Sequence, residues 1–288
     1  MMIRTFLSFN RKSGVEIIAS NGVLSPHIKK LLSLKSLPLG LPPDEVLKSF
    51  PVGETGTAVS YYKMSVDSGF GCAFIFTDRR DVDLFQYEGL LRESVKDGLD
   101  GDFVREYEDE PGPFAVPRVR IPGKFDSALQ SLVGGKKVMV VGEDWQVRNM
   151  IAFMTNLIPR DFRGCFGLTL WCNSVHEEGN LVGLPLSLIG EVESEMDGGQ
   201  LGAIVDMVNS SVLGTESTEF SKELARRIEQ GQIDYAKAKI LTIFSNASSL
   251  SPSKLNDKII EPETTRLVAE RFFGYSGNGG KQSWIERF

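Results

Sequence analysis

The sequence predicts a mixed fold, with an α+β part ahead of an α/β part. The α+β part is an antiparallel sheet with helices, and the α/β part has a parallel sheet and trailing helices. In the first part, apolar strand patterns over residues 56–66 and 70–77 are separated by a short turn, which is typical of a β-hairpin. In the second part, valine-rich or apolar runs over 136–141 and 166–172 flank an amphipathic helix. A strand, a helix and a strand in succession indicate a crossover between parallel strands.

An opening hairpin and three helices complete the expected elements of the first hundred residues. Weak alternation over 3–9 and 15–19 on either side of a polar turn predicts the hairpin. Ser25 followed by Pro26 is typical of a helix start, and Asp81 is placed to cap a longer helix that ends at Leu99. A short helix is expected from Asp44 to about Phe50.

The second half contains the clearest helical patterns. Apolar residues from Phe125 to Leu132 recur at helical spacing before two glycines, and a stripe from Val147 to Ile158 stops at Pro159. Loops are expected over 173–180 and 191–200, and short strands within 181–189 and over 202–208. Helices are expected over 218–230, 233–244 and 262–273.

Composition narrows the classes of function. The 288 residues suffice for two domains with sizeable cores. The net charge of −6 argues against nucleic acid or an anionic membrane as the main partner. Cys72, Cys165 and Cys172 lie in apolar strand contexts where reduced cysteine acts as a small apolar residue, which predicts a cytoplasmic protein. No charge-free apolar run approaches the roughly 20 residues that span a bilayer, so no integral membrane segment is expected.

Three N-terminal segments together resemble a longin domain: MIRTFLSFNRKSGVEII, YYKMSVDSGFGCAFIFTD and FQYEGLLRESVKDGL. The block 125–174, with the strand over 202–208, resembles the central α/β module of a DENN domain. The resemblance implies a longin-like domain over 1–103, a proline-rich linker over 104–123, a DENN-like α/β domain over 124–275 and a flexible tail over 276–288. Two separate layered modules are therefore expected, and a single sheet running through both halves would contradict that picture.

The second domain departs from the DENN pattern by its small size. A different α/β domain with the same local order is the alternative. The N-terminal domains of bacterial GTPase-associated proteins carry a similar strand, helix, Leu-Pro and strand succession.

The sequence contains no recognisable set of catalytic residues. His27 and His176 are isolated and lack the cysteine or carboxylate spacing of a metal site. The glycine and lysine run over 134–137 precedes a strand, whereas a phosphate-binding loop follows one. The turn over 141–144 joins a strand to a helix, but its acidic residues would repel phosphate. No catalytic residue, metal or cofactor is predicted, and whether the chain is an enzyme stays open.

The longin–DENN resemblance implies a regulator of a small Ras-like GTPase, most simply an exchange factor or an effector scaffold. An activating protein often presents an arginine to the γ-phosphate. In the folliculin class, that arginine precedes the strand that corresponds to residues 70–77. Here residues 67–69 are Asp-Ser-Gly, so this sequence has no arginine at the corresponding position. The candidate GTPase contacts are Arg79, Arg80, Arg160 and Arg163. Each has a structural alternative, as a solvated turn residue or a helix-end charge.

A second hypothesis is a non-catalytic subunit of a trafficking or signalling complex. Such a subunit would use the edge of the longin-like sheet to pair with another longin or roadblock-like protein. A partner could also recruit the protein to a membrane. A third possibility, a small-molecule enzyme on the α/β half, needs a pocket with convergent polar groups that the sequence does not assemble.

Overall fold

The computed structural model describes most of the chain in thirteen stretches. They are residues 2–10, 14–20, 23, 25–35, 44–52, 56–65, 69–77, 81–99, 114–196, 201–214, 216–249, 259 and 261–273. The strands within them are β1 (Met2–Asn10), β2 (Gly14–Ser20), β3 (Glu45–Val52), β4 (Gly56–Ser65), β5 (Gly69–Thr77), β6 (Lys137–Gly142), β7 (Leu168–Leu170), β8 (Leu181–Pro185), β9 (Leu201–Asp206) and β10 (Ser211–Gly214). The helices are α1 (Pro26–Lys35), α2 (Leu84–Leu99), α3 (Phe125–Val133), α4 (Asp144–Leu157), α5 (Ile189–Glu195), α6 (Glu219–Glu229), α7 (Ile233–Ser248) and α8 (Pro262–Phe272), with 3-10 turns η1 (Arg160–Cys165) and η2 (Leu186–Leu188).

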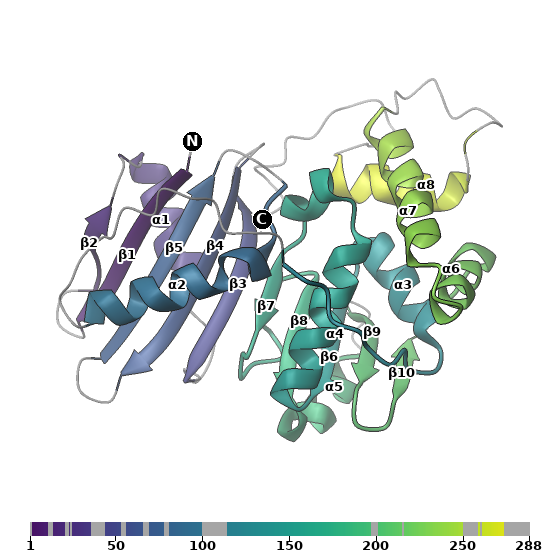
Figure 1. Ribbon diagram of the computed structural model, residues 1–288, viewed down its shortest axis with the longest axis horizontal. Helices are drawn as coiled ribbons and strands as arrows, with labels where there is room; N and C mark the ends of the chain where they lie inside the picture. The colour runs from purple at the N-terminus through teal and green to yellow at the C-terminus, as the bar shows by residue number, and fades with distance from the viewer. Residues whose placement is uncertain are drawn as a thin grey trace.

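All the described strands belong to one ten-stranded sheet in the order β10-β9-β6-β8-β7-β3-β4-β5-β1-β2 (Figure 1). Neighbours from β3 to β2 pair antiparallel, whereas β7, β8, β6 and β9 pair parallel. We call residues 2–99 the antiparallel half and residues 114–273 the parallel half. The mixed α+β and α/β fold class predicted from the sequence is confirmed at this level.

The expectation of two separate sheets is wrong. Strand β3 pairs antiparallel with β7 through Leu47↔Leu170, Lys48↔Thr169 and Ser49↔Leu168. This short ladder joins the two halves into one sheet. The proposed domain limits stay a prediction, and residues 104–113 of the linker and the whole tail over 276–288 lie outside the described residues.

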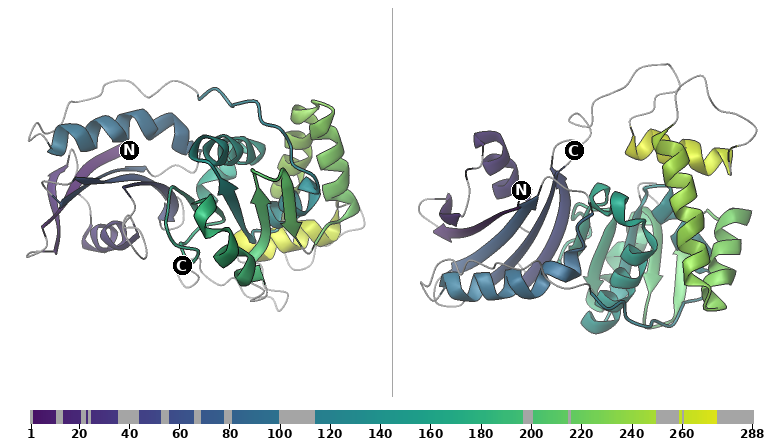
Figure 2. Two further views of the ribbon diagram at one scale, coloured as in Figure 1. Left: turned by 90° about the horizontal axis from the view of Figure 1, so that it is seen from below. Right: turned by 45° about the horizontal axis from the view of Figure 1, so that its top comes forward.

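The antiparallel half has a helix on each face of the sheet (Figure 2). Side chains alternate along each strand, so Val59 and Tyr61 of β4 join the core beneath α2, while Ala58 and Tyr62 join the core that holds Leu32 of α1. The two helices thus cover opposite faces. Strands β3, β4 and β5 have buried side chains on both faces of the sheet, so their apolar residues do not simply alternate with polar ones.

In the parallel half, the connections between strands run toward both ends of the sheet and use both of its faces. The β6–α4–β7 crossover passes over β8 on the face that α4 covers, and the β8–α5–β9 crossover passes over β6 on the other face. The close packing of α4 depends on Gly183 of β8. A Cβ there would lie 2.6 Å from Cγ1 of Val147 and 3.0 Å from Cδ1 of Ile151. The predicted strand, helix and strand are confirmed, and Pro159 ends the helical stretch as expected.

The three C-terminal helices extend the core beneath α4. Phe244 of α7 lies near Phe162 and Phe166 at centroid distances of 5.2 and 5.9 Å, and Phe272 of α8 lies 4.6 Å from Phe166. These helices are confirmed as predicted from the periodicity. Within the described residues, none of the helices combines the length and the apolar character needed to cross a membrane.

Two local predictions are wrong. The segment expected as a helix from Asp44 to Phe50 is β3, and its Val46, Leu47 and Phe50 are buried on opposite faces of the sheet. The segment 191–200, expected as an acidic turn or loop, begins within helix α5 (Ile189–Glu195), whose Val192 packs on the sheet. Strand β10 was not expected. In each case the tertiary partner, and not local propensity, decides the structure.

Candidate functional site at the junction

The contact between the two halves gathers charged side chains as well as the β3–β7 ladder. Five ion pairs connect described residues of the antiparallel half to described residues of the parallel half. They are Lys35–Glu178, Lys48–Glu177, Glu88–Arg148, Asp81–Arg160 and Asp83–Arg163. We call this contact region the junction. It is where two of the arginines singled out in the sequence are found.

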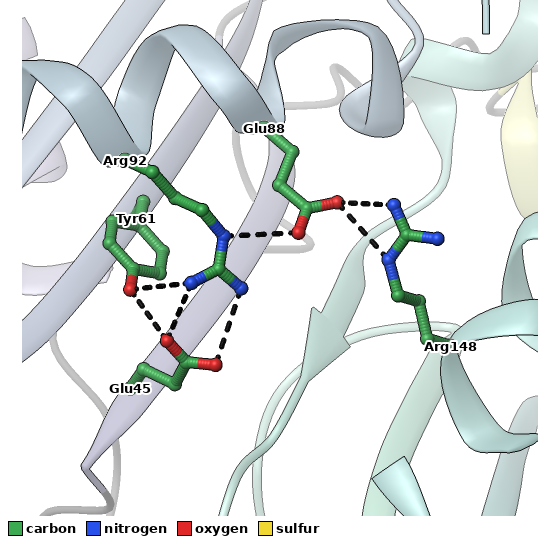
Figure 3. Close-up of polar contacts among 5 residues, drawn as sticks. All are labelled: Glu45, Tyr61, Glu88, Arg92 and Arg148. Atoms are coloured by element: carbon green, nitrogen blue, oxygen red, sulfur yellow. Dashed lines mark hydrogen bonds and ion pairs between the residues drawn. The ribbon is translucent and has the colours of Figure 1, made fainter. Parts of the chain in front are cut away.

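A cluster of five residues at the junction is drawn in Figure 3. Arg92 of α2 donates from Nη1 to Oε2 of Glu45 at 2.7 Å and from Nη2 to Oε1 at 3.2 Å. Tyr61 donates its hydroxyl to Oε2 of Glu45 at 2.6 Å and accepts from Nη1 of Arg92 at 2.9 Å. This forked geometry fixes the guanidinium against the sheet.

Glu88 extends the same cluster into the parallel half. Its Oε1 accepts from Nε of Arg92 at 3.1 Å, and its Oε2 accepts from Nη2 of Arg148 on α4 at 2.8 Å. Both guanidinium groups also stack on rings. Arg92 lies 4.7 Å from the centroid of Tyr61 and 5.0 Å from that of Trp171. The cluster therefore links β3, β4, α2, α4 and the residue after β7.

Hydrogen bonds among Glu45, Tyr61 and Arg92 favour the charged forms of Glu45 and Arg92. Burial opposes the charge of Glu45, but hydrogen bonds from Arg92 and Tyr61 outweigh it and hold the pKa of Glu45 below its usual value. Burial and the hydrogen bond to Glu45 raise the pKa of Tyr61. Burial opposes the charge of Arg92 as well, yet its pairing with Glu45 keeps its pKa above the ordinary value. At neutral pH Glu45 and Arg92 are therefore both charged, and their ion pair holds β3 and α2 together.

A second charged contact is fully enclosed. Nζ of Lys48 on β3 lies 2.6 Å from Oε1 of Glu177, in the loop that follows β7, and both side chains are buried. Lys48 also lies in the β3–β7 ladder opposite Thr169. Backbone and side chain of the same residue therefore bind the two halves together.

Arg163 is held in place by three partners. Its Nη1 donates to Oδ2 of Asp83 at 2.8 Å, its Nη2 to Oδ1 of Asn156 at 3.1 Å and its Nε to the carbonyl of Ile158 at 3.3 Å. Burial lowers the pKa of Arg163 and the charge of Asp83 opposes that shift. The bonds to Asn156 and Ile158 place Arg163 at the C-terminal end of α4, which is the helix-end role considered for it in the sequence, and the bond to Asp83 connects η1 to the residue before α2.

Arg160 occupies a different environment at the other end of the same turn. Its side chain is 66% exposed, and its Nε lies 3.7 Å from Oδ2 of Asp81. Arg79 and Arg80 lie outside the described residues, and the described chain resumes at Asp81. Of the four arginines chosen from the sequence, the structure thus brings Arg160 and Arg163 to the junction, one exposed and one enclosed.

The residues that build the junction were missed in the sequence, apart from the two arginines. The spacing of Glu88 and Arg92, four residues apart on a helix, is the one local signal that could have found part of the cluster. No group of three or more metal-binding side chains occurs within the described residues. No family model matches the chain, and no curated protein matches it.

Proposed function

We propose that this protein regulates a small Ras-like GTPase through protein contacts, as an exchange factor or an effector scaffold. The observation that carries the proposal is the layout of the chain. An antiparallel half with a helix on each face precedes a parallel half with helices on both faces, in the order that a longin domain followed by a DENN-like domain implies, although one sheet runs through both halves where that resemblance implies two. The longin-like and DENN-like assignments are part of the proposal.

The junction supports this function because its contacts hold the antiparallel half and the parallel half together, so that a partner meets both halves in a fixed arrangement. An exchange factor needs no acid or base of its own; it acts by binding one conformation of the GTPase more tightly than another. Such differential binding requires contacts held at a fixed spacing. The β3–β7 ladder, the Lys48–Glu177 pair and the cluster around Arg92 hold that spacing across the two halves.

The proposed contact surface lies at the start of η1 and α2. Arg160 is exposed there beside Asp81, and Arg79 and Arg80 directly precede Asp81 in the sequence. An exposed arginine can form a bidentate bond to a carboxylate of a partner, which makes Arg160 the residue of choice for a first substitution. Arg163 supports this surface from beneath.

An activating role is the nearest alternative within the same class. It would require an arginine that can reach the γ-phosphate of the bound nucleotide. Arg163 does not suit that role because Asp83, Asn156 and Ile158 hold its guanidinium. Arg160 is exposed enough for it, and Arg79 and Arg80 stay candidates from the sequence alone.

A non-catalytic longin-type subunit is the second candidate function. Within the described residues, β2 forms the end of the sheet and pairs with β1 alone. The opposite end is partly covered, since Gly123 bridges Ser211 of β10. An uncovered edge strand is the site where a strand of another longin or roadblock-like protein could add to the sheet.

The test measures two rates on a panel of purified Ras-like GTPases, the release of fluorescent GDP and the hydrolysis of GTP. Exchange activity predicts that release from one GTPase accelerates by about tenfold or more, which corresponds to a release barrier lowered by about 1.4 kcal/mol. Arg160→Glu should remove most of that effect. Arg266→Glu is the matched control, because Arg266 is 54% exposed and lies 3.7 Å from Glu270 on α8.

The other outcomes separate the alternatives. Accelerated hydrolysis that is lost in Arg160→Ala would assign an activating role instead of exchange. Unchanged rates with tight binding of the GTP-loaded form would support the effector scaffold. Unchanged rates, no binding to any GTPase and a stable complex with a longin-type protein would replace the proposal with the subunit function.

A further inference from the structure

Helix α1 lies in a stretch of the chain that has no acidic residue. Residues 17–43, between Glu16 and Asp44, contain no aspartate or glutamate, although the whole chain carries a net charge of −6. The lysines of α1 are Lys29, Lys30 and Lys35. The charge of this segment is therefore opposite in sign to that of the chain, and such a local excess can attract an anionic surface.

One side of α1 packs on the sheet and the other side is exposed. Leu32 is fully buried, in the core that also holds Val46 of β3. At 3.6 residues per turn, His27, Lys30 and Leu34 share the opposite side of the helix, and all three are exposed. We call these three residues the outer face of α1.

Exposed aliphatic residues accompany the basic ones at both ends of α1. Leu34, in the last turn, is 66% exposed, and Val23, three residues before Pro26, is 93% exposed. Three residues of chain span at most about 10 Å, so Val23 stays close to the first turn of the helix. Lysine between exposed aliphatic residues is typical of a helix that lies in a membrane interface. There the aliphatic groups enter the acyl boundary and the ammonium groups meet the headgroups.

Two groups of acidic side chains lie on the same side of the sheet as α1. Glu178 is 69% exposed and pairs with Lys35 at 3.3 Å, at the C-terminal end of α1. Helix α5, which packs on this side of the parallel half, carries Glu191, Glu193 and Glu195. In both views of Figure 2, α1 stands against the antiparallel half, apart from the strands and helices of the parallel half. An anionic surface can therefore meet the outer face of α1 from the antiparallel end without lying over α5.

The packing of α1 favours a flat partner surface over an enclosing one. Basic amphipathic helices bind either to membrane surfaces or in protein grooves that enclose their apolar side. A groove would have to take Leu32 out of the core in which it is buried. A membrane needs only the outer face, which is exposed while α1 stays on the sheet.

We propose that the outer face of α1 docks on an anionic lipid membrane, with Leu34 and Val23 in the interface and the lysines at the headgroups. Each lysine near such a surface strengthens binding by about fivefold. Because few lysines and two aliphatic side chains take part, the contact is reversible and depends on salt. This inference goes beyond the proposed GTPase regulation and concerns a different surface, so either can fail without the other.

The test mixes the full chain with phosphatidylcholine vesicles, with or without phosphatidylserine, and measures the fraction of protein that sediments with them. We expect binding to the anionic vesicles alone at low salt, and its loss as salt is added. Lys30→Glu should weaken this binding by about tenfold or more, because repulsion replaces attraction. Lys222→Glu is the matched control. Lys222 is 53% exposed on α6, and its substitution changes the net charge equally, so binding should stay close to that of the wild type.

A second matched pair tests the aliphatic contribution. Leu34→Ala should weaken vesicle binding several-fold, whereas Leu241→Ala, at a position 44% exposed on α7, should not. No binding to anionic vesicles, equal binding to both kinds of vesicle, or equal loss in Lys30→Glu and Lys222→Glu would each overturn the proposal. Binding of polyglutamate but not of vesicles, lost in Lys30→Glu, would assign the outer face to an acidic protein instead.

Discussion

Arg148 of α4 donates two hydrogen bonds to a single carboxylate oxygen of Glu88 on α2, from Nη2 at 2.8 Å and from Nε at 3.3 Å. The same carboxylate binds Arg92 of its own helix. One acidic side chain of the antiparallel half thus holds an arginine from each half. The pairing connects α2 to α4, which cover the two halves from one face of the sheet and whose paired residues lie 60 positions apart.

Removing the shared carboxylate should weaken the junction. In Glu88→Ala, Arg148 loses its carboxylate partner, and we expect the free energy of unfolding to fall by about 2–3 kcal/mol in denaturant titrations. Lys222→Ala, which breaks the exposed pair with Glu219, should leave the free energy of unfolding almost unchanged. Equal effects of the two substitutions would contradict a structural role for Glu88.

The Glu45 carboxylate should make stability depend on acidity. Because the folded state holds the pKa of Glu45 below its unfolded value of about 4.3, the stabilisation is present above that pH and is lost as the pH falls through the folded pKa. The difference in unfolding free energy between wild type and Glu45→Gln should therefore be largest near neutral pH and shrink in acid. Measurements between neutral pH and about pH 3 test this, and a constant difference would refute it.

The enclosed pair at the β3–β7 ladder should behave as a coupled unit. Lys48→Met leaves the buried carboxylate of Glu177 without its ammonium partner, and we expect a loss of about 3–5 kcal/mol. Lys48→Met combined with Glu177→Leu should cost clearly less than the sum of the single substitutions. A double-mutant cycle measures that coupling, and additive losses would show that the pair contributes nothing specific.

Substitutions of the two arginines of η1 should have different effects on stability. Arg163→Ala removes three hydrogen bonds from an enclosed side chain and should lower the unfolding free energy by about 2 kcal/mol. Arg160→Ala should change stability by no more than about 0.5 kcal/mol, because its pair with Asp81 is exposed. Thermal or chemical unfolding of both variants checks this. A larger loss of unfolding free energy for Arg160→Ala would show that Arg160 stabilises the fold and would contradict its assignment to the contact surface.

The elements that sequence reasoning predicted correctly are those with strong local signals. The helix before Pro159 has a clear apolar stripe, and the strands beside it are short valine-rich or apolar runs bounded by glycines. The failure at β3 has a physical cause. Since α1 and α2 cover both faces of that strand, Val46, Leu47 and Phe50 are all buried, and the alternation that distinguishes a strand from a short helix is lost.

The junction could not be predicted because its partners lie far apart in the sequence. Lys48 and Glu177 are separated by 129 positions, and Glu88 and Arg148 by 60. No local pattern brings such residues together, and the three-residue ladder between β3 and β7 is too short to leave a periodic signal. Arg160 and Arg163 could be chosen by type, but their opposite environments follow from the packing of η1 against β3 and the start of α2.

We propose that this protein distinguishes the states of a small Ras-like GTPase. The most direct measurement is its affinity for the nucleotide-free, GDP-loaded and GTP-loaded forms of the same GTPase, because a protein that binds all states equally shifts none of them. We predict that the dissociation constants for two of these states differ by about tenfold or more. Equal affinity for all three states, or no binding across the panel, would contradict the claim.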